Sequence, residues 1–89
     1  MPTRDTPYAT ELASAVFTFP DGQEGRIERL FIKKEQQEAI RFSWWKEGRM
    51  IPRPLDLDEK ELIALIRAAV AQNVFTAGFI SELRSALAG

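Results

Sequence analysis

The chain has 89 residues, of which 45% are hydrophobic and 28% are charged, and its formal net charge is −1. These values are typical of one soluble globular domain with a modest core, and the near-zero charge excludes a general electrostatic attraction to nucleic acid or to an anionic membrane. The chain contains no cysteine and no histidine, which excludes disulfides and thiolate chemistry and removes the commonest general base and metal ligand.

The N-terminal part of the chain predicts a loose lead-in followed by two strands. Residues 1–12 contain two prolines and three threonines without clear periodicity, which is typical of a poorly ordered segment. Residues 13–19, ASAVFTF, and residues 26–34, RIERLFIKK, have the β-branched and aromatic content of strands. Between them, Pro20, Asp21 and Gly22 provide the chemistry of a turn.

A hairpin is predicted in the middle of the chain. The polar segment 35–38 leads into residues 39–46, AIRFSWWK, which alternate as a strand, and Glu47 and Gly48 then provide a hairpin turn. Residues 49–55 are the predicted returning strand. Pro52 and Pro54 have no backbone N–H to donate, so we expect this fourth strand to lie at an edge of the sheet.

The strongest helix signals follow the fourth strand. Asp56 or Asp58 is the predicted N-cap, with Glu59 or Glu61 as its partner in a capping box. Capping accounts for all four carboxylates, and their spacing lacks the glycine and the downstream glutamate of a calcium loop, so we expect no metal site. Asn73 is the predicted stop. Residues at helical spacing form the predicted apolar side: Leu62, Leu65, Ile66, Ala69 and Val70.

A second helix is predicted from its N-cap Thr76 to residue 88, with Phe75 and Ile80 at the two positions of a hydrophobic staple. The order of elements predicts an α+β fold, in which a four-stranded antiparallel β-meander is followed by two C-terminal α-helices packed on one face. We expect one domain over residues 13–89, after the lead-in of residues 1–12. The predicted buried side of the second helix consists of Phe79, Ile80, Leu83 and Leu87.

Side chains alternate across a strand, so the third predicted strand divides into two faces. Ile40, Phe42 and Trp44 form an apolar face that should meet the helices, whereas Trp45 shares the other face with Arg41. We therefore expect Trp44 in the core and Trp45 on an open face. Residues 26–53 are also the basic part of the chain, with eight Lys and Arg side chains against four Glu. If the registers between the strands place these side chains on the same side, the open face contains Arg29, Phe31, Lys33, Arg41, Trp45, Arg49 and Arg53.

Two kinds of function fit such a face. Bases of single-stranded DNA or RNA stack on aromatic rings with roughly 1–3 kcal/mol each, while Arg and Lys neutralise the phosphates. The alternative is a protein-interaction or homodimerisation domain without a nucleic-acid role, in which the N-terminal segment or a second subunit covers Trp45. The exposure of Trp45 and of the arginines discriminates between these hypotheses.

The stretch IRFSWWKEGRMIPRPLDLDEKELIALI starts with an Ile-Arg strand that contains aromatic residues, turns at a polar residue and a glycine, and continues through a basic, proline-containing strand into an acid-capped helix. In these features residues 26–70 resemble the PC4 family of transcriptional coactivators. The resemblance implies a dimer that binds single-stranded DNA on its sheet. The family's Lys-Gly-Ile step before the helix reads Arg53-Pro54-Leu55 here, and residues 76–88 have no counterpart in the family pattern. The contact positions implied by the resemblance are Arg41, Trp45, Lys46, Arg49 and Arg53.

The sequence does not indicate catalysis. A hydrolase needs a nucleophile and a base, and no serine or threonine has a histidine to work with. We therefore expect no enzymatic activity and no cofactor. No segment approaches the roughly 18 apolar residues of a membrane span, so we expect no membrane partner and predict a cytoplasmic location.

Overall fold

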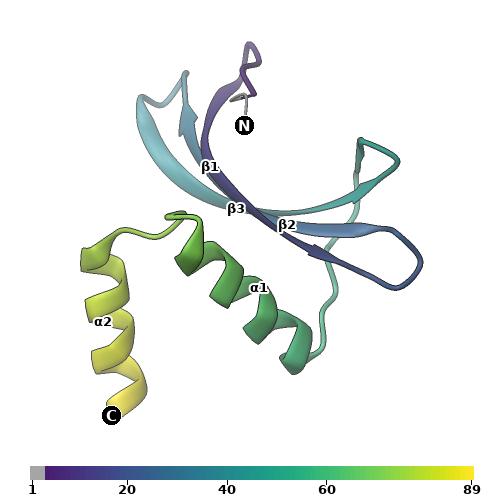
Figure 1. The fold of residues 1–89 in the computed structure, drawn as a ribbon. Helices are drawn as coiled ribbons and strands as arrows, with labels where there is room; N and C mark the ends of the chain where they lie inside the picture. Colours follow the sequence, from purple (N-terminus) through teal and green to yellow (C-terminus); the bar gives the residue numbers. More distant parts are fainter. Residues whose placement is uncertain (1–3) are drawn as a thin grey trace.

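The computed structural model describes residues 4–89, so residues 1–3 of the predicted lead-in lie outside the described part of the chain. A four-stranded antiparallel sheet is followed by two helices, which confirms the predicted α+β class (Figure 1). The strand order β1-β2-β3-β4 confirms the meander. The elements are β1 (Ala9–Thr18), β2 (Glu24–Ile32), β3 (Gln37–Lys46), β4 (Arg49–Ile51), α1 (Glu59–Ala71) and α2 (Ala77–Ala88).

β1 begins at Ala9 rather than at residue 13, so the predicted start of the strand is wrong. Ala9 and Glu11 pair with Ile32 and Leu30 of β2, and the register then shifts between Glu11 and Ala13. A bulge of this kind interrupts the alternation of side chains. The residues before position 13 therefore lack a strand period in the sequence, although pairing with β2 holds them in the sheet.

β4 covers only Arg49–Ile51 and lies at the edge of the sheet, next to β3. The predicted edge position is confirmed, but the predicted extension to residue 55 is wrong. Pro52 and Pro54 fall just beyond the end of the strand, since neither can donate a hydrogen bond to a ladder. The connection to β3 is the predicted turn, in which Glu47 and Gly48 have positive φ angles of 51° and 77°.

The main core lies between α1 and the first two strands. The apolar side predicted for α1 is confirmed at Leu65 and Ala69, whereas Leu62 and Val70 are exposed. Within residues 4–89, α1 packs on β1 and β2 and not on β3 or β4. A helix about 10 Å across covers roughly two strands that lie about 4.8 Å apart. The buried residues of this core are Ala15, Ile27, Leu65, Ala69 and Val74.

Side-chain and backbone caps define both ends of α1. Asp58 accepts a hydrogen bond from the Glu61 amide at 2.7 Å, and the Glu61 carboxylate accepts one from the Asp58 amide at 2.9 Å, which confirms the capping box. At the other end, Asn73 has a φ of 58°, as the predicted stop requires. The Val74 amide donates to the Ala69 carbonyl at 2.9 Å, which is the long bond of a Schellman motif. This turn also places the apolar Val74 in the core.

α2 starts at the predicted N-cap, where the Thr76 hydroxyl accepts a hydrogen bond from the Phe79 amide at 3.1 Å. Phe75 packs on the ring of Phe79, with ring centroids 4.9 Å apart. No residue of α2 is buried, and Figure 1 shows the helix pointing away from the sheet. Of the two helices, only α1 therefore covers the sheet face that both were predicted to cover.

Truncation of Leu65 tests this core. Leu65 is fully buried, so Leu65→Ala should lower the free energy of unfolding by roughly 2–5 kcal/mol. Ile63 on the same helix is 51% exposed, and Ile63→Ala is a matched control that should change the stability only slightly. Urea denaturation followed by circular dichroism measures both variants. Equal midpoints would show that the buried side of α1 is wrongly assigned.

Candidate functional site

The register of β2 against its neighbours assigns the strand residues to two faces. Ile27 pairs with Phe42 and shares a buried cluster with Leu65 of α1, so its side of the sheet is the helix face. Glu28 pairs with Arg41 and points to the opposite side. Figure 1 shows the sheet curving away from α1, so this opposite side is the concave face.

The predicted single face of cations and aromatic rings is wrong, because the structure divides its residues between the two faces. Arg29 pairs with Ile40 and lies with Phe31 on the helix face, while Arg41 and Trp45 lie on the concave face. Alternation within each strand is visible in the sequence. The register between strands is not, and a slip of one residue moves every side chain of a strand across the sheet.

Two of the cations predicted to contact nucleic acid, Arg29 and Lys33, form ion pairs within the domain. Arg29 donates to the Val74 carbonyl at 2.6 Å and pairs with the Glu38 carboxylate at 2.7 Å. Lys33 pairs with Asp5 at 2.9 Å and so ties the N-terminal segment to the end of β2. Both side chains therefore have partners within the domain.

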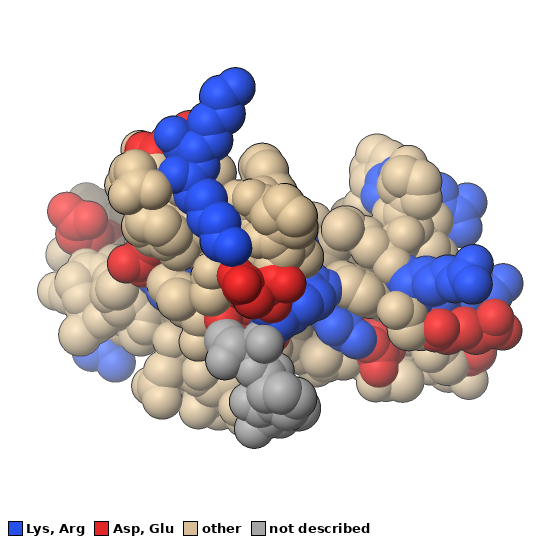
Figure 2. Space-filling model, turned by 90° about the horizontal axis from the view of Figure 1, so that it is seen from above, with Lys and Arg blue, Asp and Glu red and all other residues tan. Residues whose placement is uncertain are grey.

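Of the remaining predicted cations, Arg41 pairs with the carboxylate of Glu28, and the other three lie around the β3–β4 hairpin. Lys46 of β3 lies opposite Arg49 of β4 in the strand register. The guanidinium of Arg53 lies 5.7 Å from the centroid of the Trp44 ring. None of these three cations takes part in the ion pairs found among residues 4–89. Figure 2, which looks onto the concave face, shows basic and acidic side chains interspersed rather than one continuous basic field.

The environments of the two tryptophans differ from those predicted. Trp44 is half-buried at the edge of the helix face, where its ring stacks on Phe19 with centroids 5.3 Å apart. Trp45 is only 7% exposed, because the guanidinium groups of Arg26 and Arg4 lie 3.9 Å and 4.7 Å from its ring centroid. The prediction of a core Trp44 and an open Trp45 is therefore wrong: α1 does not reach β3, and Arg4 returns from the N-terminal segment to cover Trp45.

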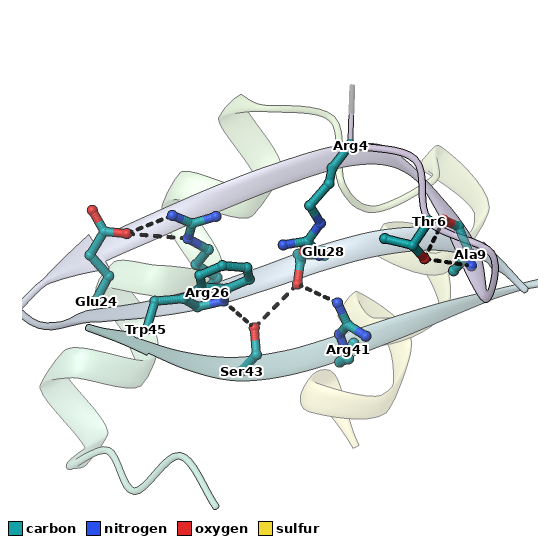
Figure 3. Close-up of polar contacts among 9 residues, drawn as sticks. All are labelled: Arg4, Thr6, Ala9, Glu24, Arg26, Glu28, Arg41, Ser43 and Trp45. Atoms are coloured by element: carbon teal, nitrogen blue, oxygen red, sulfur yellow. Dashed lines mark hydrogen bonds and ion pairs between the residues drawn. The ribbon is translucent and has the colours of Figure 1, made fainter. Parts of the chain in front are cut away.

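Glu28 is the candidate residue that the sequence analysis missed. Its carboxylate is fully buried on the concave face. It accepts hydrogen bonds from Arg4 at 2.8 Å, Arg41 at 3.3 Å and Ser43 at 3.2 Å (Figure 3). The Ser43 hydroxyl in turn accepts one from the indole N–H of Trp45 at 2.8 Å. The only signal in the sequence was a glutamate among the apolar residues of the second strand.

The environment shifts the pKa values of two neighbouring carboxyl groups in opposite directions. Burial by itself would raise the pKa of Glu28, but the hydrogen bond with Glu11 and the charges of Arg4 and Arg41 hold it below its ordinary value. Burial raises the pKa of Glu11, and the hydrogen bond and negative charge of Glu28 raise it further. Glu28 is therefore the group that stays ionised, and Glu11 is the one that takes up a proton first.

A hollow of about 300 Å³ adjoins this ion network on the concave face. Its size is at the lower end of the range for small-ligand pockets. Its walls combine the apolar side chains of Tyr8, Leu30 and Met50 with the charged groups of Arg4, Glu11 and Arg41. The hollow thus places apolar surface directly beside the guanidinium group of Arg4, which is paired with the carboxylate of Glu28.

The charged groups of the site pair with one another. Within residues 4–89, no three His, Cys, Asp or Glu side chains come together where they could hold a metal ion. Neither helix in this part of the chain has the length and hydropathy needed to cross a lipid bilayer. The concave face holds three guanidinium groups: Arg4 and Arg41 pair with the Glu28 carboxylate, and Arg4 and Arg26 lie over the Trp45 ring.

Comparison with known proteins gives no match to a family model, to a curated protein or to a solved structure. The resemblance to the PC4 family therefore stays a prediction. The function has to be inferred from the geometry of the two faces.

Replacement of Glu11 tests the charge balance around Glu28. The raised pKa of Glu11 means that its ionisation opposes folding, so the free energy of unfolding should decrease as the pH rises from the ordinary value of 4.5 through the raised pKa. Glu11→Gln cannot ionise. At neutral pH the variant should therefore be more stable than the wild type, and the difference should shrink as the pH falls towards 4.5.

Urea denaturation at neutral and at acidic pH measures this difference. Glu38→Gln, which changes a half-exposed carboxylate on the helix face, is the control and should not show the same gain. A Glu11→Gln protein that is less stable than the wild type at neutral pH would show that the ionised Glu11 stabilises the fold through Arg4.

Proposed function

We propose that this chain is a homodimerising module in which the helix face of one copy receives α2 of another. The observation that carries the proposal is an uncovered apolar strip on β3. Ile40 and Phe42 are 38% and 49% exposed, although they lie on the same face as the core. Contiguous exposed apolar surface of this kind is typical of protein-interaction sites.

α2 has the complementary surface. Phe79, Leu83 and Leu87 follow one another at intervals of four residues and therefore lie on one side of the helix. Leu87 is 79% exposed, and no residue of the helix is buried. A helix of 12 residues is marginal in water by itself, because most helices in proteins are stabilised by the packing of an apolar side. A surface outside its own chain would stabilise α2.

A second copy is the occupant that best fits both surfaces. Each copy has one uncovered strip and one helix without a sheet beneath it, so a reciprocal exchange across a twofold axis covers both strips. The dimensions also agree, since α1 covers two of the four strands and a second helix of about 10 Å would cover the other two. The additional burial compensates for the small core of an 89-residue domain.

Sedimentation equilibrium tests the proposal. The wild type should be dimeric, and Phe42→Asp should raise the dimer dissociation constant at least about 30-fold, because each of the two symmetric contacts then buries an unpaired polar group at a cost of about 1–3 kcal/mol. Leu83→Asp should have the same effect from the side of α2. Leu12→Asp is the matched control, since Leu12 is 45% exposed on β1, outside both surfaces. A monomeric wild type, or a folded Phe42→Asp protein that dimerises normally, would overturn the proposal.

Binding of single-stranded nucleic acid is a second candidate function, at the β3–β4 hairpin instead of an open sheet face. It is favoured by the half-buried ring of Trp44 and by the neighbouring cations Lys46, Arg49 and Arg53, which take part in no ion pair within residues 4–89. Aromatic stacking and phosphate neutralisation are the two contributions that such binding needs.

A fluorescence titration tests this second candidate. A single-stranded oligonucleotide should quench the tryptophan emission at low salt, and the affinity should fall as salt is added. Arg53→Ala should weaken binding, whereas Arg29→Ala, which removes a cation already paired with Glu38 on the helix face, should bind like the wild type. Absence of quenching at low salt would exclude binding at the hairpin.

A further inference from the structure

A buried carboxylate and a buried indole ring together form a receptor for one guanidinium group on the concave face. Glu28 accepts a hydrogen bond from Arg4 through Oε2 at 2.8 Å, and the same guanidinium lies 4.7 Å from the centroid of Trp45. A carboxylate next to an aromatic ring suits arginine above other cations, because its planar group stacks and donates hydrogen bonds at the same time.

The parts of this receptor belong to the sheet and hold one another in place. Ser43 donates to Oε1 of Glu28 at 3.2 Å and accepts from the indole N–H of Trp45 at 2.8 Å. Arg41 also donates to Oε1, so Oε2 is the oxygen that is left for a further donor. The guanidinium that fills the receptor is the exception: Arg4 comes from the segment before β1 (Figure 3).

The charges around the receptor favour a cation even when Arg4 is not counted. Without Arg4, the carboxylates of Glu11, Glu24 and Glu28 face two cations, Arg41 and Arg26, and Arg26 is itself paired with Glu24 at 2.9 Å. A buried carboxylate that loses a partner destabilises the fold. The site is therefore built to contain a positive group that the sheet itself does not supply.

We infer that this receptor binds the arginine side chain of another polypeptide and that Arg4 occupies the site as an internal substitute. The side chain of Arg4 is 32% exposed whereas that of Glu28 is fully buried, so the occupant has a path to solvent without any opening of the sheet. Exchange of one guanidinium for another conserves every hydrogen bond of Glu28. This inference does not depend on dimerisation, because the receptor lies on the face opposite α1.

The hollow beside Arg4 indicates which partner sequence fits. Tyr8, Leu30 and Met50 offer apolar walls next to the receptor, so an apolar side chain close to the partner's arginine would be buried there. In an extended segment, residues two apart point to the same side. The structure therefore favours a peptide in which arginine and a large apolar residue are separated by one residue.

An NMR titration of the full chain tests the inference with the peptide acetyl-Arg-Ala-Leu-amide. The readout is the indole N–H signal of Trp45, which Trp44→Phe distinguishes from that of Trp44. In Arg4→Ala the peptide should shift this signal saturably. The wild type should bind at least about tenfold more weakly, because Arg4 competes at an effective concentration on the order of millimolar. The peptide with citrulline, a neutral isostere of arginine, should not bind.

Two further variants show whether the carboxylate is responsible. In the Arg4→Ala background, Glu28→Gln should abolish binding, whereas Glu38→Gln on the helix face should leave it unchanged. Should Arg4→Ala not fold, Arg4→Lys keeps a positive charge at the site and serves for the same titration. Should Glu28→Gln not fold, the comparison of arginine with citrulline decides.

Two results would overturn the inference. One is a folded protein with a substituted Arg4 whose Trp45 signal does not respond to the arginine peptide. The other is an equal response to the arginine and citrulline peptides, which would mean that only the apolar hollow is filled. In either case Arg4 would be a structural tie between the N-terminal segment and the sheet.

Discussion

The register of β2 between β1 and β3 is the constraint on which both faces of this domain depend. Ile27 pairs with Ala15 on one side and with Phe42 on the other, and this places it under α1. Glu28, one residue later, must then face the concave side. A slip of one residue would place a carboxylate under α1 and an isoleucine among charged groups. The apolar core and the ion network thus enforce the same register from opposite faces.

The ion network around Glu28 does more to specify one arrangement of the chain than to raise the free energy of unfolding. A buried ion pair repays the cost of desolvation only when its remaining hydrogen-bonding positions are filled. Here Arg4, Arg41 and Ser43 fill those of Glu28, and Ser43 also fixes the indole ring of Trp45. The network therefore joins the N-terminal segment, β2 and β3 in one arrangement, and it leaves one position of Glu28 to a group from outside the sheet.

The two faces expose opposite kinds of surface. The helix face has an apolar strip at Ile40 and Phe42, because one helix is too narrow to cover four strands. The concave face buries charge, and its largest aromatic ring is covered by arginine side chains instead of by apolar groups. In the binding modes proposed above, a polypeptide on the first face would be recognised by apolar burial, and one on the second face by its cation.

The sequence by itself determined the features that depend on neighbours within a few residues. The capping box of Asp58, the stop at Asn73, the N-cap at Thr76 and the turn at Glu47 and Gly48 are local hydrogen-bonding or backbone preferences, and all four are present. Tertiary structure decided the rest. The start of β1 depends on a bulge against β2, and the burial of Trp45 depends on Arg4, which is distant from it in the sequence. Inter-strand register and helix width likewise decide three other features: the division of the cations between two faces, the ion network of Glu28 and the departure of α2 from the sheet. Neither quantity is encoded in the alternation of a single strand.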